Sequence, residues 1–283
     1  MYMRRLLSFI LILTIIQPLQ AKYNPVVNIA EEQLADVKKG VVAVKRLPKL
    51  VREACIAEKL GLLFMPDGSA AYSNKESFHE KENVKYFKVL HGARFIGTDG
   101  KIYGFYDVLG TLNKNPKLQG SWVKAKQAIF NYGDDAIFSA FKEDVAKIIL
   151  LTAKNRLMSM PEELRSSCLA QYSGWVYTQD GKNAVKTWHY VSRSAVNLCE
   201  GTHKQAVWNE ILPNALFTTP DGAELSWDKI YKEQGKHRQA WGRVGLCVDL
   251  VGIKDIMAIF PKERDAMREA YERRTGTSAP PLQ

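Results

Sequence analysis

The chain has 283 residues, 46% of them hydrophobic and 10% aromatic, a composition that excludes an intrinsically disordered protein and a small scaffold held by disulfides alone. Its formal net charge is +10, from 40 Lys and Arg against 30 Asp and Glu. This positive charge favours contact with anionic surfaces such as lipid headgroups, cell-wall polymers or nucleic acid, although an ordinary solvated surface explains it equally well.

The first 21 residues have the three parts of a secretory signal peptide. A short basic start precedes an apolar run (residues 6–16) and a polar exit that ends at the small Ala21. The apolar run is too short for a transmembrane helix, and an uncleaved N-terminal anchor is the alternative because Leu19 stands two positions before Ala21. We therefore expect a signal peptide over residues 1–21 and an exported, periplasmic or secreted mature chain over residues 22–283, without a transmembrane span.

Four cysteines lie in the mature part, and none of them forms a CxxC pair. In an oxidising compartment an even number of cysteines favours two disulfides over free thiols. We expect Cys168 to pair with Cys199, because a predicted hairpin between them would bring its flanks together, and Cys55 to pair with Cys247 by elimination. The absence of CxxC pairs gives no support to a thioredoxin-type redox site or to a zinc ribbon.

Four Asp-Gly dipeptides punctuate the chain, each between residues of strand character. Asp-Gly supplies the positive backbone angles of tight hairpin turns, so each dipeptide predicts a hairpin. Their spacings of 32, 81 and 41 residues are irregular, and we interpret them as local turns and not as a repeat architecture. The expected strand pairs are 62–65 with 70–72, 94–96 with 102–106, and 175–177 with 185–191, while strand 216–218 leads through its turn to a helix.

Helical patterns fill the intervals between these turns. The clearest helix covers residues 134–157, where an apolar face recurs at steps of three and four from Ile137 to Thr152. Ser159 and Glu162 match a capping box at the start of the next helix. The expected helices are 28–47, 48–60, 134–157, one from Pro161 to about Gln171, a helix or strand within 244–260, and 261–276.

These elements predict a single α+β domain in which several β-hairpins with Asp-Gly turns pack against helices, stabilised by disulfides. Residues 113–120 are rich in Asn, Lys and Pro and form the candidate boundary if the chain has two lobes. Residues 277–283 are expected to form a frayed tail.

The segment from Tyr172 to Arg243 is the richest candidate for a site, because it holds five of the six tryptophans and three of the five histidines. Aromatic walls with titratable groups are typical of ligand pockets, and a Trp-rich core is the alternative. From Lys229 to Arg243, basic residues alternate with aromatic ones, a pattern that suits phosphate contacts with ring stacking as well as a solvated amphipathic helix. The candidate binding residues are Trp188, Trp227, Asp228, Tyr231, Lys236, Arg238 and Trp241.

The sequence is compatible with two functions. The first is an exported soluble protein that acts by binding, as a cell-envelope or secretion-apparatus component, with an anionic envelope polymer or a protein as its partner and nucleic acid less favoured. The second is a secreted hydrolase of cell-wall, lipid-linked or phosphodiester substrates that uses His189, His203 or His237 as general base. The GxSxG, HExxH, GxxxxGK[ST] and strand-associated GxGxxG motifs are absent. No cofactor or metal is expected, because Gly201 weakens the helix on which Cys199 and His203 would share one face.

Overall fold

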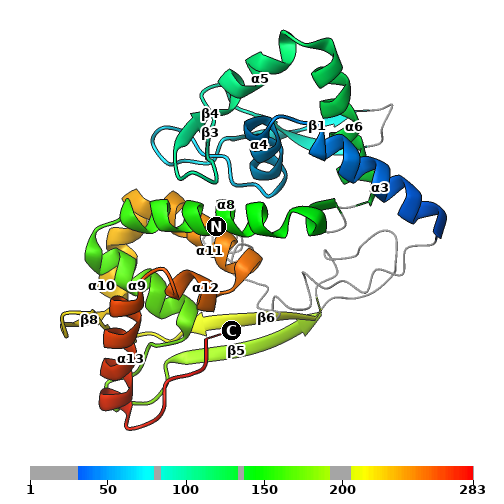
Figure 1. Cartoon of the computed structure of the whole chain (residues 1–283). Helices are drawn as coiled ribbons and strands as arrows, with labels where there is room; N and C mark the ends of the chain where they lie inside the picture. Colours follow the sequence, from blue (N-terminus) through cyan, green and yellow to red (C-terminus); the bar gives the residue numbers. More distant parts are fainter. Residues whose placement is uncertain (1–30, 80–83, 133–136, 192–204, 283) are drawn as a thin grey trace. The chain divides into compact units, whose positions relative to one another are not determined.

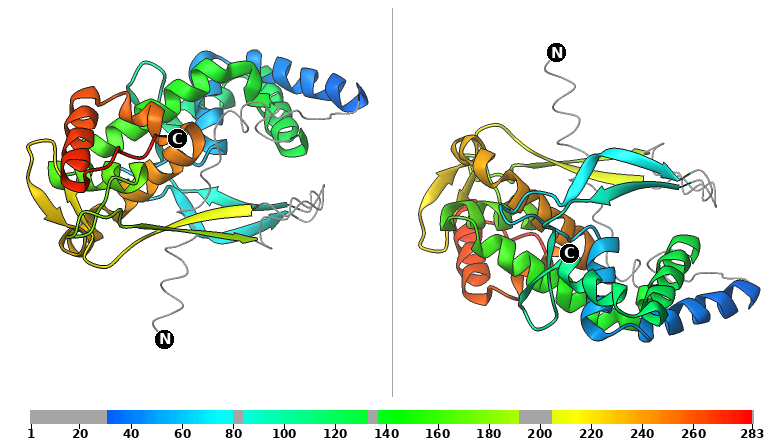
Figure 2. Two further views of the ribbon diagram at one scale, coloured as in Figure 1. Left: turned by 90° about the horizontal axis from the view of Figure 1, so that it is seen from below. Right: turned by 90° about the horizontal axis from the view of Figure 1, so that it is seen from above.

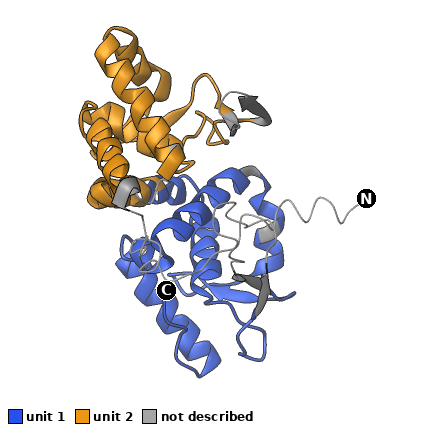
Figure 3. Cartoon of the chain, turned by 90° about the vertical axis from the view of Figure 1, so that its right-hand side faces the viewer, with its two compact units in different colours: residues 1–19, 153–283 blue, residues 20–152 orange. Residues whose placement is uncertain are grey.

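A computed structural model describes residues 31–79, 84–132, 137–191 and 205–282 (Figure 1). This part of the chain is mainly helical and contains four two-stranded antiparallel hairpins. Hairpins and helices therefore occur as expected, although helices dominate. The chain divides into two compact units, unit 2 from residues 20–152 and unit 1 with residues 153–283 (Figure 3).

Unit 2 opens with two helices, continues through two hairpins and closes with further helices. Its elements are α3 (Glu31–Lys45), α4 (Lys49–Lys59), β1 (Tyr72–His79), β2 (Val84–Val89), β3 (Arg94–Ile96), β4 (Ile102–Gly104), α5 (Phe105–Asn113), α6 (Pro116–Tyr132), a 3-10 turn (Ser139–Phe141) and the start of α8 (Lys142–Met158). Helices α3 and α6 pack against each other. Their approach depends on Gly40, because a Cβ atom there would lie 2.4 Å from the Cβ of Ala128.

Unit 1 likewise begins with a helix, continues through two hairpins and closes with further helices. Its elements are α9 (Glu162–Ser173), β5 (Val185–Val191), β6 (Gln205–Ile211), β7 (Leu216–Thr218), β8 (Glu224–Ser226), α10 (Trp227–Glu233), a 3-10 helix (Gln234–His237), α11 (Arg238–Val251), α12 (Ile253–Met257) and α13 (Pro261–Thr275). Strands β5 and β6 form a long two-stranded ribbon in both views of Figure 2, with Trp188 opposite Trp208. Strands β7 and β8 form a short hairpin closed by the Asp221 turn.

The two units repeat one backbone pattern. Phe64 exchanges two backbone hydrogen bonds with Arg94, and Tyr177 exchanges the same two with Leu216. Equivalent residues are 113 positions apart before the long hairpin and 122 positions apart after it, because the second long hairpin is longer. Further backbone hydrogen bonds recur at these offsets: Leu62 to Ala57 and Trp175 to Ala170, Leu90 to Ala71 and Leu212 to Ala184, Gly97 to Lys101 and Thr219 to Ala223, and Phe105 to Ala93 and Trp227 to Ala215.

Positive φ angles recur at the same positions. The equivalent pairs are Gly61 and Gly174, Gly68 and Gly181, Gly92 and Asn214, and Gly100 and Gly222. A left-handed conformation tolerates Gly, and Asn better than most other residues, so the same turns are specified in both copies. The interpretation of the four Asp-Gly turns as unrelated is therefore wrong, since the turns repeat as two pairs, at Asp67 with Asp180 and at Asp99 with Asp221.

Each copy of the repeat also includes a helix near its C-terminal end, α8 in the first copy and α13 in the second. Arg52 on α4 forms an ion pair with Asp144 on α8 at 3.3 Å, and its counterpart Arg165 on α9 pairs with Glu263 on α13 at 3.9 Å. Each of these helices begins directly after a buried phenylalanine. Helix α13 therefore occupies in the second copy the place of α8 in the first, with equivalent residues 119 positions apart.

The predicted pairing of 62–65 with 70–72 is present only as one bridge, between Phe64 and Ala70, and the predicted pairing of 175–177 with 185–191 is wrong. Tyr177 forms its single bridge across the turn with Asn183. The strands that follow these turns, β1 and β5, pair instead with β2 and β6. Turn chemistry located the reversals correctly, but strand pairing depends on segments farther along the chain.

Most helix predictions are confirmed by α3, α4, α9 and α13, which lie close to the expected bounds. The apolar face over residues 137–152 is buried, although a 3-10 turn precedes α8 where one continuous helix was expected. The capping box is wrong, because the N-cap of α9 is Pro161, without a side-chain cap, and the Ser159 hydroxyl donates to the carbonyl of Arg156 at 2.7 Å.

Two segments expected to be irregular have definite structure. Most of residues 113–120 are helical, since α5 ends at Asn113 and α6 begins at Pro116, and the division between the units falls inside α8. The C-terminal tail is held in place, because Trp175 Nε1 donates to the carbonyl of Pro280 at 3.1 Å and the Ala279 N–H donates to Glu272 at 3.1 Å. The expectation of a frayed tail is wrong for the residues described.

No disulfide forms among the cysteines that the structure describes. Cys55, Cys168 and Cys247 are free thiols, fully buried, and Cys199 lies outside the described residues. Cys55 and Cys168 occupy equivalent positions on α4 and α9, where each thiol packs into its core as a small apolar group. Burial raises the pKa of Cys55 and that of Cys247 to about 12.

The predicted signal peptide also lies outside the described residues. Within the part of the chain that is described, no helix is both long and apolar enough to cross a bilayer.

Candidate ligand-binding cleft

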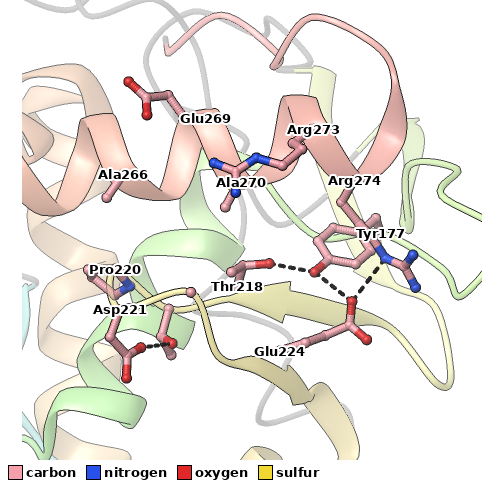
Figure 4. Close-up of a pocket in the computed structure, with 12 residues that line it drawn as sticks. Tyr177, Thr218, Pro220, Asp221, Glu224, Ala266, Glu269, Ala270, Arg273 and Arg274 are labelled. Atoms are coloured by element: carbon pink, nitrogen blue, oxygen red, sulfur yellow. Dashed lines mark hydrogen bonds and ion pairs between the residues drawn. The ribbon is translucent and has the colours of Figure 1, made fainter.

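Unit 1 contains a cleft of about 460 Å³ between the turn that follows β7 and one face of α13 (Figure 4). On α13, Ala266, Glu269, Ala270 and Arg273 stand at helical spacings of three and four, which places them on the same face. The two alanine methyl groups leave the middle of this face shallow, and the charged side chains flank it.

One wall of the cleft is a connected set of hydrogen bonds around Tyr177. The Tyr177 hydroxyl donates to Glu224 Oε2 at 3.1 Å and lies 2.5 Å from Thr218 Oγ1, and Arg274 Nε donates to the same Glu224 oxygen at 3.0 Å. Because Tyr177 has one proton and gives it to the carboxylate, Thr218 donates to the Tyr177 oxygen. Burial raises the pKa of Tyr177 to about 12, so the hydroxyl is neutral at physiological pH.

The turn after β7 forms a second wall. The Asp221 carboxylate accepts from the Thr219 hydroxyl and from the Ala223 N–H, the latter at 3.4 Å. These hydrogen bonds, with that from Thr219 the largest cause, lower the pKa of Asp221. Asp221 is therefore ionised at neutral pH, and its side chain stabilises the turn that Gly222 closes at φ +90°.

Two charged side chains of the cleft remain uncommitted. Arg274 is bound by Glu224 and by the carbonyl of Gln179, whereas Arg273 and Glu269 have no hydrogen-bond or ion-pair partner among the described residues. Figure 4 shows these two side chains extending from α13 in different directions. Both are exposed, so their charged groups face solvent or whatever enters the cleft.

The first copy of the repeat lacks the polar wall, which is the hydrogen-bonded set of Tyr177, Thr218, Glu224 and Arg274. The residues equivalent to Tyr177, Thr218, Glu224 and Arg274 are Phe64, Ile96, Ile102 and Asn155. Three of the four polar groups thus have apolar counterparts. The network belongs to the second copy alone and is not required for the repeat to fold.

In the first copy a leucine side chain lies beside the equivalent turn. Leu151 on α8 is equivalent to Ala270 on α13. A Cβ atom built on Gly100 would lie 4.0 Å from Leu151 Cδ2, whereas one built on Gly222 would meet no atom within 4 Å. An alanine in the position of a leucine therefore opens the cleft beside the turn.

The residues suggested by the sequence do not line this cleft. Trp227 and Trp241 are buried, and their rings pack edge to face with their centroids 5.8 Å apart. Trp241 Nε1 donates a hydrogen bond to the Gln171 side chain at 2.9 Å. They belong to the core, and their burial is inconsistent with the stacking surface that the sequence suggested. Asp228 accepts the N–H of Asn214 at 3.4 Å and so supports the loop before β7.

The structure describes the remaining candidates only in part. Arg238 is exposed at the start of α11, and His237, half-buried, ends the preceding 3-10 helix. For Trp188 and His189 on β5, Tyr231 on α10 and Lys236, the structure describes the backbone alone. His203 lies outside the described residues. No group of His, Cys, Asp and Glu suited to hold a metal occurs among the residues searched, which are those described.

Comparison with protein-family models, with curated protein sequences and with solved structures found no match. The repeat is therefore the internal reference for the cleft. The repeat is visible in the sequence when residues 61–72 are aligned with 174–185 and residues 93–109 with 215–231. The first pair of segments begins with Gly, the second pair begins with Ala, and each pair shares an Asp-Gly turn. That alignment would have marked Tyr177, Thr218 and Glu224 as departures from the shared scaffold, whereas the equivalence of Ala270 with Leu151 follows from the ion pairs of the tertiary structure.

Proposed function

We propose that the protein is an exported binding protein and that its ligand occupies the cleft between the β7–β8 turn and α13. The observation that carries this proposal is Ala270 in the position of Leu151, because the turn lies beside a leucine in the first copy and beside an open cleft in the second. A volume of about 460 Å³ lies within the usual range for small-molecule sites.

The polar wall supports the same proposal. The wall is held in one arrangement by its own hydrogen bonds before any ligand arrives, which lowers the entropic cost of binding. Arg273 and Glu269 provide uncommitted charges beside it. A site with a preformed wall and a few unpaired polar groups is typical of recognition of a small polar ligand.

Export is part of the proposal and rests on the sequence of residues 1–21. Under this proposal the protein is a component of the cell envelope or of a secretion apparatus. The ligand is then a molecule met outside the cytosol, either free or as part of an envelope polymer or a protein partner.

Filling the cleft tests the binding site directly. Ala270→Leu restores the leucine of the first copy and should displace any ligand, while Ala258→Leu is the matched control, because Ala258 is exposed in the same unit and outside the cleft. Binding of a fragment library that contains carboxylates, phosphates, amines, amino acids and sugars can be measured by NMR on the full mature chain.

We expect fragments that shift the resonances of Arg273 and Gly222 to lose at least tenfold in affinity in Ala270→Leu and to bind Ala258→Leu as they bind the parent protein. Equal binding to Ala270→Leu and the parent would overturn the site. A library that shifts no resonance of the cleft would overturn it as well.

A further inference from the structure

We infer that the cleft takes a zwitterionic ligand, a free amino acid or a short peptide, with its carboxylate on Arg273 and its ammonium on the acidic side of the cleft. This inference rests on the proposed binding function and names the chemistry of the ligand. It comes from the charges that the cleft leaves uncommitted.

The charges divide into a committed and an uncommitted set. Glu224 and Arg274 neutralise each other at 3.0 Å within the wall. Among the residues that line the cleft, Arg273 and Glu269 then remain unpaired, and Asp221 adds a second negative charge. Asp221 uses one of its oxygens in the turn and keeps the other available.

A ligand of a single charge matches this set poorly. A purely anionic ligand would pair with Arg273 but would lie close to Asp221 and Glu269, whose like charge opposes it. A purely cationic ligand would pair with the two carboxylates and be opposed by Arg273. A ligand that carries an ammonium and a carboxylate a few bonds apart satisfies both signs.

The geometry of the individual groups agrees with these roles. The guanidinium of Arg273 is planar and suits bidentate contact with a carboxylate, which is the stronger of the two expected interactions. Glu269 stands four residues before Arg273 on α13, about one helical turn away, and can accept from an ammonium. Ala266, Ala270 and Pro220 supply small apolar contacts between them, which suit short aliphatic side chains.

Three matched peptides distinguish the ligand classes: the dipeptide Ala-Ala, its N-acetyl form without the ammonium, and its C-terminal amide without the carboxylate. We expect Ala-Ala to bind about tenfold more tightly than either blocked form, as measured by NMR titration of the mature chain at pH 7. Similar binding of Ala-Ala and its acetyl form would replace the zwitterion with a simple anion, and similar binding of Ala-Ala and its amide would replace it with a cation. Either result overturns the inference.

Two variants assign the charges to residues. Arg273→Gln should reduce Ala-Ala binding about tenfold and leave the amide unchanged, and Glu269→Gln should reduce Ala-Ala binding and leave the acetyl form unchanged. Lys262→Gln on the same helix, outside the cleft, is the control. If Ala-Ala does not bind while other fragments bind and are lost in Ala270→Leu, the zwitterion inference fails and the proposed binding function stands.

Discussion

The repeat can be tested at Glu53, because the two copies stabilise the same turn through different side chains. In the first copy the buried Glu53 carboxylate lies 2.5 Å from the Thr98 hydroxyl and accepts the Thr98 N–H at 3.3 Å. In the second copy the equivalent residues are Ser166 and Pro220. Proline has neither an N–H nor a hydroxyl, so no carboxylate is needed there.

The cost of removing Glu53 follows from these contacts. Glu53 is 2% exposed and Thr98 is 4% exposed, so Glu53→Ala leaves two buried donors without partners, each at about 1–3 kcal/mol. Lys49 lies 3.7 Å from Glu53, but its side chain is 65% exposed, so loss of that ion pair adds little. We expect Glu53→Ala to lower the free energy of unfolding by about 3 kcal/mol.

Thr98→Pro should be costly for the converse reason, because it removes both hydrogen-bond donors from the buried Glu53 carboxylate and leaves only the exposed Lys49 ammonium beside it. The double variant Glu53→Ser/Thr98→Pro reproduces the second copy and should cost at least about 2 kcal/mol less than the sum of the single changes. Urea unfolding followed by circular dichroism measures the parent, Glu53→Ala, Glu53→Ser, Thr98→Pro and the double variant. A loss below about 0.5 kcal/mol for Glu53→Ala, or additive costs in the double variant, would refute the equivalence of the two turns.

Three further results are expected from the same structure. Cys55 and Cys247, whose pKa is raised to about 12 by burial, should resist a thiol reagent at pH 8 in the folded protein and react after denaturation, as followed by site-resolved mass spectrometry. The pKa of Tyr177 is about 12 when folded and about 10 when unfolded, so its contribution to stability is present below pH 10 and is lost between pH 10 and 12; the stability gap between the parent and Tyr177→Phe should narrow over that interval. Trp175→Phe removes the indole donor to Pro280, so limited proteolysis should release the C-terminal tail faster than in the parent, and equal rates would contradict the role of this hydrogen bond.

The cysteines show where sequence reasoning failed. An even count in an expected exported chain predicts disulfides, but pairing requires two thiols to meet, and the core positions of Cys55 and Cys168 recur because the scaffold recurs. The tryptophans left two interpretations open, a binding surface and a Trp-rich core. Contacts of Trp227 and Trp241 with each other, and of Trp241 with Gln171, place both in the core.

Local chemistry determined much of this protein from the sequence alone. Pro261 at the first position of α13 and Gly276 after its last, together with the four Asp-Gly turns, act over a few residues, so the sequence by itself located these helix ends and reversals. The cleft was decided by the tertiary structure. Whether the space beside a turn is filled depends on a residue some fifty positions away, Leu151 beside Gly100 and Ala270 beside Gly222, and only folding brings those positions together.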